Sequence, residues 1–102
     1  MQNQYFNNGV IVNPSSLVEG DRAQIIYKGL LFSSGADSVY LRTGFGCEWN
    51  NVIDIKMSKT AEGFEATVPV TSRESLNLAF KDSASNWDNN YGSNYTFVID
   101  RK

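Results

Sequence analysis

Histidine is absent from this sequence, and cysteine occurs once, as Cys47. Without histidine the chain lacks the commonest general base and every Ser–His or Cys–His nucleophile pair. A lone cysteine cannot form an intramolecular disulfide, and structural zinc sites need several Cys or His ligands. We therefore expect packing alone to hold the fold, no metal or other cofactor, and a buried or half-buried thiol at Cys47.

Clustered positive charge and long apolar runs are also missing. Lys and Arg number 9, Asp and Glu number 11, and the net charge is −2. Nucleic-acid binding draws much of its affinity from neutralised phosphates, so it is disfavoured, and the same shortage argues against an anionic membrane surface. No apolar run approaches the roughly 20 residues of a membrane-spanning helix.

Short runs in which apolar and polar residues alternate recur along the chain, and this period of two is typical of half-buried β-strands. These runs are Ala23–Lys28, Ser38–Phe45, Ile53–Ser58, Phe64–Val70, Leu76–Lys81 and Tyr95–Asp100, with a further strand expected at Val10–Val12. Turn residues separate them, and no stretch keeps a helical period. The pattern predicts an all-β, antiparallel β-sandwich of about seven to eight strands.

The length of 102 residues suits one domain, which we expect to span residues 1–102. Its core should be built from large apolar side chains on the inward positions of the predicted strands. The candidates are Phe64, Val68, Leu78, Phe80, Phe97 and Ile99.

Both tryptophans of the chain lie in stretches rich in Asn and Gly. Trp87 lies within Ser85–Tyr95, where Asn and Asp favour turns and tolerate left-handed backbone, so we expect a loop there. Trp49 follows Gly44–Cys47 in a second loop at the end of a strand. A tryptophan in so polar a loop is not expected to be wholly buried.

An indole face can pack on the C–H face of a pyranose ring, and Asn amides can both donate to and accept from vicinal hydroxyls. The alternative is that Trp87 anchors its loop and the Asn residues only shape turns.

Two carboxylates would suffice for glycoside hydrolysis, but Glu62, Glu65 and Glu74 lie beside turns or on strand faces, so no catalysis is expected. The first ligands of a helix-loop-helix calcium site have the spacing of Asn86, Asp88 and Asn90. The rest of that motif is missing, because Phe97 occupies the position of the bidentate Glu.

The chain resembles the starch-binding carbohydrate-binding modules of family 25, to which repeats in plant starch synthases are related. The resemblance runs from about Ala23 to Ile99, and its most specific part is Asn86–Asn90 followed by Gly92 and Asn94–Tyr95. Further matching segments are Val39–Arg42, Gly44–Gly46, Trp49, Met57, Gly63–Val68 and Leu78–Asp82. It implies an immunoglobulin-like β-sandwich in which Trp49 and Trp87 form a platform for an α-1,4-glucan.

Family members can carry a histidine on the strand before the first tryptophan, and here Arg42 or Tyr40 is expected to take its place. With the asparagines of the Ser85–Tyr95 loop, the resemblance implies a carbohydrate site formed by Trp49, Trp87, Asn89, Asn90, Asn94, Arg42 and Tyr40. The expected function is non-catalytic binding of starch, glycogen and maltooligosaccharides. The alternative is a β-sandwich protein-interaction module that has lost sugar binding.

The expected partner is an α-glucan, together with a covalently linked amylase-type catalytic domain in a longer parent protein. The segment Met1–Asn8 is polar and lacks the charged and apolar regions of a signal peptide. We expect a cytoplasmic location if the chain is a whole protein, and an extracellular one if it was excised from a secreted amylase.

Overall fold

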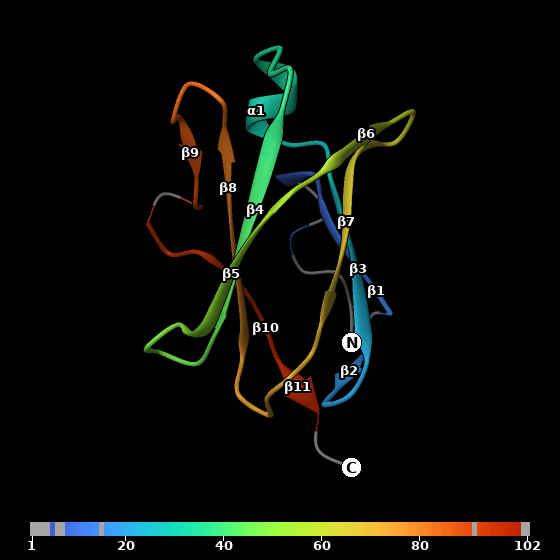
Figure 1. Ribbon diagram of the computed structural model, residues 1–102, viewed down its shortest axis with the longest axis vertical. Helices are drawn as coiled ribbons and strands as arrows, with labels where there is room; N and C mark the ends of the chain where they lie inside the picture. The colour runs from blue at the N-terminus through green and yellow to red at the C-terminus, as the bar shows by residue number, and fades with distance from the viewer. Residues whose placement is uncertain (1–4, 6–7, 15, 91, 101–102) are drawn as a thin grey trace.

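Two antiparallel sheets pack face to face in the computed structural model, which describes residue 5 and residues 8–14, 16–90 and 92–100 (Figure 1). The first sheet has the strand order β1 (Val10–Asn13), β3 (Arg22–Tyr27), β7 (Gly63–Pro69) and β6 (Ser58–Thr60). The second has the order β10 (Tyr95–Phe97), β8 (Leu76–Asp82), β4 (Val39–Phe45) and β5 (Asn50–Lys56), with β9 (Trp87–Asp88) paired to β8. The predicted antiparallel β-sandwich is confirmed.

A pair of two-residue strands and one short helix complete the described fold. A parallel pair joins β2 (Leu17–Val18) to β11 (Ile99–Asp100), and one four-residue helix, α1 (Leu30–Ser33), follows β3. Within the described residues, no helix is long and apolar enough to cross a membrane.

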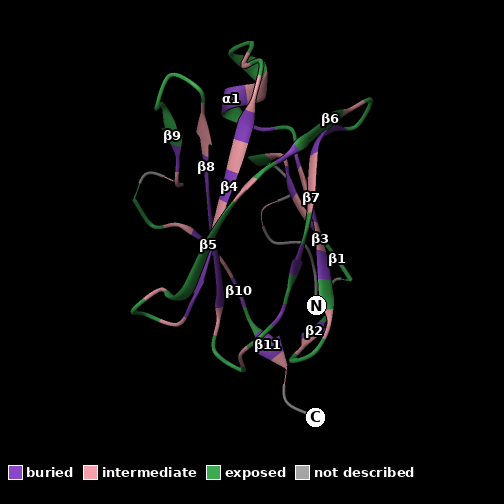
Figure 2. Ribbon diagram, in the orientation of Figure 1, coloured by how far each residue is buried: buried purple, intermediate pink, exposed green. Residues whose placement is uncertain are grey.

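The core lies between the two sheets and is built from every second residue of their strands. On β3, and on β4 as far as Thr43, the buried positions alternate with half-buried or exposed ones (Figure 2). All six residues predicted for the core are buried, and Phe64, Val68, Leu78 and Phe80 are exposed by 1% or less. The stacked rings of Tyr27 and Phe80, with centroids 4.1 Å apart, join the two sheets across this core.

Three predictions from the sequence need correction. Trp87 lies not in a loop but on β9, whose two residues pair with Phe80 and Lys81 of β8. The run from Tyr95 to Asp100 is not one strand, because the chain leaves β8 after Phe97 and pairs with β2 from Ile99 onwards. Cys47 is exposed, since it lies in the turn between β4 and β5.

The edge position of β5 also changes how its alternating residues are buried. β5 pairs only with β4, and most of its residues are exposed. Ile53 is therefore exposed and Ile55 half-buried, although both belong to the apolar set of this run. Only Met57, just beyond the strand, is buried.

Candidate functional site

A groove of about 370 Å³ brings both tryptophans together on the outer face of the second sheet. Its lining residues are Arg42, Trp49, Val52, Ala79, Trp87, Asn89 and Asn94, and we call it the Trp groove. Five of these seven belong to the site predicted from the sequence. The seven lining residues come from β4, β5, β8, β9 and the connections next to β5 and β9.

The floor of the Trp groove is formed by outward-facing residues of the two central strands. In the antiparallel register Arg42 stands opposite Ala79 on β8 and opposite Asp54 on β5. Opposite residues share one face of a sheet, and the neighbouring pair Leu41 and Phe80 fills the core, so Arg42 and Ala79 face outward. The methyl group of Ala79 leaves space that a longer side chain would fill.

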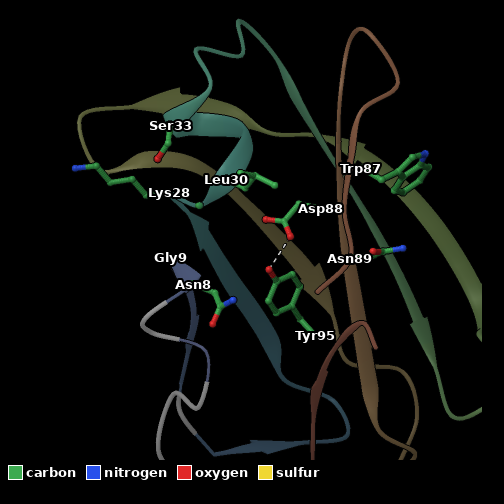
Figure 3. A pocket seen from close by; sticks show the side chains of 10 residues that line it. Asn8, Gly9, Lys28, Leu30, Ser33, Trp87, Asp88, Asn89 and Tyr95 are labelled. Atoms are coloured by element: carbon green, nitrogen blue, oxygen red, sulfur yellow. Dashed lines mark hydrogen bonds between the residues drawn. The ribbon is translucent and has the colours of Figure 1, made fainter. Parts of the chain in front are cut away.

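Trp87 forms one wall of the groove, and the pleat of β9 sets its direction. Successive residues of a strand point to opposite faces, so Trp87 is 41% exposed while Asp88 is buried. Figure 3 shows the two side chains pointing to opposite sides of the strand.

Asp88 holds β9 in place through buried hydrogen bonds to two tyrosines. The Tyr27 hydroxyl donates to Oδ2 at 2.5 Å, and the Tyr95 hydroxyl donates to Oδ1 at 2.7 Å. The Tyr27 hydroxyl also accepts from the backbone N–H of Leu31 at 3.0 Å. Burial, reinforced by the hydrogen bond to Asp88, raises the pKa of Tyr27 well above its ordinary value. The phenol therefore stays a hydrogen-bond donor, and the backbone beneath Trp87 is fixed.

Trp49 also lines the groove and packs directly on the backbone of β4 at Gly44. A Cβ placed on Gly44 would lie 2.6 Å from Cε3 of the indole, so only glycine leaves room for the ring. Trp49 itself has φ +52°, a left-handed conformation that is uncommon for a bulky residue. The β4–β5 register shifts at this point, and the β-bulge re-aims the start of β5.

Arg42 connects the floor of the groove to Trp87. Its Nε and Nη2 donate to the two carboxylate oxygens of Asp54 at 2.7 Å and 3.1 Å, a bidentate geometry that fixes the guanidinium. The Arg42 hydrogen bonds lower the pKa of Asp54, and the same pairing raises the pKa of Arg42. The guanidinium carbon lies 5.2 Å from the centroid of the Trp87 ring, and the Lys81 ammonium lies 5.7 Å from it. Both are cation–π distances.

The predicted asparagines divide between groove and loop. Asn89 and Asn94 line the Trp groove, and Asn89 also accepts from the backbone N–H of Gly92 at 3.0 Å. Asn90 has φ +55° and donates to the backbone carbonyl of Asn94 at 3.2 Å, so its amide shapes the loop. Tyr40 lies outside the groove, where the Lys81 ammonium is 5.8 Å from its ring.

Four further residues shape this site, and the sequence analysis gave none of them a role in it: Gly44, Val52, Asp54 and Ala79. Gly44 and Ala79 lie in segments that carry the family resemblance, but no motif marks them as site residues. The outward positions of the predicted strands around Arg42 could have drawn attention to the small Ala79 and the acidic Asp54, but only the strand register shows that both stand beside it.

Chemically, the Trp groove can stack on apolar ring faces and exchange hydrogen bonds with hydroxyl groups. Its described lining offers two indoles, two amides and one fixed guanidinium, and no carboxylate. Elsewhere in the described part of the chain, no three His, Cys, Asp or Glu side chains are grouped so as to hold a metal ion.

Residues 23–80 of the chain match the family described as starch/carbohydrate-binding module (family 53). The chain belongs to this family. The sequence prediction of a starch-binding module is thus confirmed, whereas the match is to family 53 and not specifically to family 25. The matched segment of the family 53 module includes Arg42, Gly44, Trp49 and Ala79 and ends before Trp87.

Two curated relatives are similar to this module. An alpha-amylase of Clostridium acetobutylicum is 38% identical over 84 residues, which cover 80% of this chain and 10% of that protein. An alpha-amylase of Niallia circulans is 34% identical over 80 residues, which cover 76% of this chain and 6% of that protein. The chain thus spans a tenth or less of the length of these relatives. No solved structure gives a significant match.

Proposed function

We propose that this module binds α-1,4-glucans, such as starch, glycogen and maltooligosaccharides, in the Trp groove without cleaving them. The observation that carries the proposal is the shared groove. Trp49 and Trp87 are far apart in the sequence, yet both line one hollow together with Asn89 and Asn94. Membership of a starch-binding family supports the same conclusion.

The two indoles are proposed to provide most of the binding energy by stacking on glucose rings. Asn89, Asn94 and Arg42 bond glucose hydroxyls, which exchange bonds with water for bonds with protein at small net gain. A curved α-glucan suits two rings set at an angle, whereas a flat cellulose chain would need rings in a row. A total of roughly 4–7 kcal/mol corresponds to a Kd between about 1 mM and about 10 μM.

Titration calorimetry with maltoheptaose tests the proposal on the wild type, Trp49→Ala and Trp87→Ala. Each substitution should nearly abolish binding while the thermal melt stays cooperative, because Trp87 is 41% exposed and Trp49 is half-buried. Thr67→Ala is the matched control, since Thr67 is exposed on β7 of the other sheet. It should bind like the wild type.

Two results would contradict this role for the tryptophans. If both variants bind as tightly as the wild type, the Trp groove is not the glucan site. If both variants unfold, the tryptophans are anchors of their chain segments. Absence of glucan binding by the folded wild type would favour the alternative of a protein-interaction module.

We further propose that the module acts beside a catalytic domain in a longer protein. The two alpha-amylase relatives, matched over only 10% and 6% of their length, support this arrangement. The isolated chain should release no reducing sugar from starch or maltooligosaccharides. Release that survives repurification and is lost on substitution of one Asp or Glu would overturn the non-catalytic assignment.

A further inference from the structure

A second hollow adjoins the Trp groove on the other side of Trp49. It measures about 550 Å³ and shares Trp49 and Asn94 with the groove. The rest of its lining includes Cys47, Asn77, Thr96 and Val98. We call it the Thr96 hollow.

Strand register places the Thr96 hollow on the same outer face of the sheet as the Trp groove. Asn77 stands opposite Gly44 on β4 and opposite Thr96 on β10. On β8, Asn77 is two residues from Ala79 in the floor of the groove. Residues two apart on a strand share a face of the sheet, so Asn77 and its cross-strand neighbours lie on the same face as the groove. Trp49, packed over Gly44, therefore forms the ridge between the two hollows.

The floor of the Thr96 hollow is polar and internally fixed. The Asn77 amide donates to the backbone carbonyl of Gly46 at 2.7 Å, and its oxygen accepts from the Thr96 hydroxyl at 3.0 Å. Val98, which is 53% exposed, adds an apolar wall. Fixed hydroxyl and amide groups beside an apolar surface match the two kinds of surface that a sugar ring presents.

We propose that the Thr96 hollow binds further glucose residues of the same α-glucan chain that occupies the Trp groove. This inference rests on the proposed function and adds to it a preference for longer chains. A glucan crossing the Trp49 ridge would contact the ring at the boundary of both hollows. The residues beyond the ridge then bind as an intramolecular extension of the first contact, which raises affinity without a second association cost.

The hollow on the opposite side of Trp87 is a poorer route for the chain. It is lined by Asn8, Leu30, Asp88 and Tyr95 among others, and in Figure 3 the Trp87 side chain points away from it. A glucan leaving the groove in that direction would have to pass around β9. The path over Trp49 stays on one face of the sheet.

Cys47 provides a direct probe, because it is exposed, lines the Thr96 hollow and is the only cysteine of the chain. The rate of its alkylation by iodoacetamide is measured with no sugar, with maltotriose and with maltoheptaose, each sugar near saturation. Maltoheptaose should slow alkylation several-fold, whereas maltotriose, held in the Trp groove, should leave the rate almost unchanged. Equal rates under all conditions, with maltoheptaose bound, would overturn the proposal.

A second test measures sugar affinity by calorimetry on a variant in which the Arg of Val98→Arg fills the Thr96 hollow. Wild type should bind maltoheptaose about tenfold more tightly than maltotriose. Val98→Arg should lose most of that difference and keep the maltotriose affinity, while Thr67→Arg on the other sheet should keep both affinities. An unchanged preference for maltoheptaose in folded Val98→Arg would overturn the extension but leave the proposed function standing. If the wild type binds neither sugar, the proposed function and the extension both fail.

Discussion

On the outer face of the first sheet, polar side chains reach across the strands and bond to one another. The Asn13 amide donates to Gln24 at 3.3 Å, and the Gln24 amide donates to Glu65 at 3.1 Å. The outer face of the second sheet is built differently. Next to Trp49 and Trp87, its central strands carry the small residues Gly44 and Ala79 beside the longer Arg42.

This difference gives a physical reason for the groove on the second sheet. Side chains of similar length that are bonded across the strands cover the backbone evenly. Small residues next to two indole rings leave a hollow that is lined by both apolar and polar groups. The capacity to hold a ligand therefore depends on the lengths of neighbouring outward residues as much as on their chemistry.

The largest predicted effect is a loss of unfolding free energy when Asp88, the buried residue that holds β9 beneath Trp87, is removed. Asp88→Ala removes the two buried hydrogen bonds that the Tyr27 and Tyr95 hydroxyls donate to a carboxylate, and each bond of this kind contributes about 1.5–3 kcal/mol. We expect urea denaturation to show a loss of about 3–5 kcal/mol. Gln24→Ala, its counterpart on the other sheet, should lose about 1 kcal/mol or less. Similar losses for the two variants would contradict the anchoring role of Asp88.

Filling the floor should make the two faces alike. Ala79→Leu places extra methyl groups between the two tryptophans, so we expect calorimetry to show maltoheptaose affinity reduced at least about tenfold, which is about 1.4 kcal/mol. The melting temperature should change little, because the added side chain points into the groove and not into the core. Thr67→Leu adds similar bulk to the other face and should leave binding unchanged. Wild-type affinity in Ala79→Leu would show that the ligand does not enter the groove.

A smaller disturbance should follow from one methyl group beneath Trp49. Gly44→Ala brings Cβ within 2.6 Å of the indole as it now lies, so the ring must shift. We expect an overpacking cost of about 1–2 kcal/mol in thermal unfolding and an affinity for maltoheptaose that falls several-fold. Retention of both stability and affinity would mean that the Trp49 ring moves without consequence for binding.

The smallest effect should come from Asp54→Asn, which removes the ion pair that fixes Arg42. Both partners are about half exposed, so the stability cost should stay below about 1 kcal/mol. The pKa of Asp54 is lowered in the fold, so the pairing contributes stability above the ordinary carboxyl pKa of about 3.9 and loses it as pH falls further. Melts from pH 6 down to pH 3 should show this acid-side loss diminished in Asp54→Asn. Identical pH profiles would contradict the contribution of the pair.

The sandwich and much of the candidate site could be predicted from the sequence. The alternation of apolar residues marked β3, β4, β7 and β8, because a half-buried strand needs that period and few other structures have it. Asn-rich and Gly-rich segments drew attention to both tryptophans. The resemblance to starch-binding modules then placed Trp49, Trp87, Asn89, Asn94 and Arg42 in one site, and the structure brings these residues together.

The remainder depends on contacts between distant segments. The strand at Trp87 is only two residues long, and it is held by hydrogen bonds that Asp88 accepts from Tyr27 of β3 and Tyr95 of β10. Local sequence propensity cannot predict these bonds, because they join segments that are distant in the sequence. The division of the last strand at Val98 likewise depends on β2, some eighty residues earlier. Gly44 and Ala79 contribute to the site because their small size leaves room for the Trp49 ring and for the groove. Only the strand register shows that they lie beside the groove.

The placement of both indoles on one groove has a photophysical consequence. Because the chain has two tryptophans and no others, its indole emission arises entirely from the walls of the Trp groove. Arg42 and Lys81 lie 5.2 Å and 5.7 Å from the Trp87 ring, so displacing either cation or the nearby water would change the emission spectrum. The protein thus carries its own fluorescent reporter at the groove, and an occupant of that surface can be followed on the unlabelled wild-type chain.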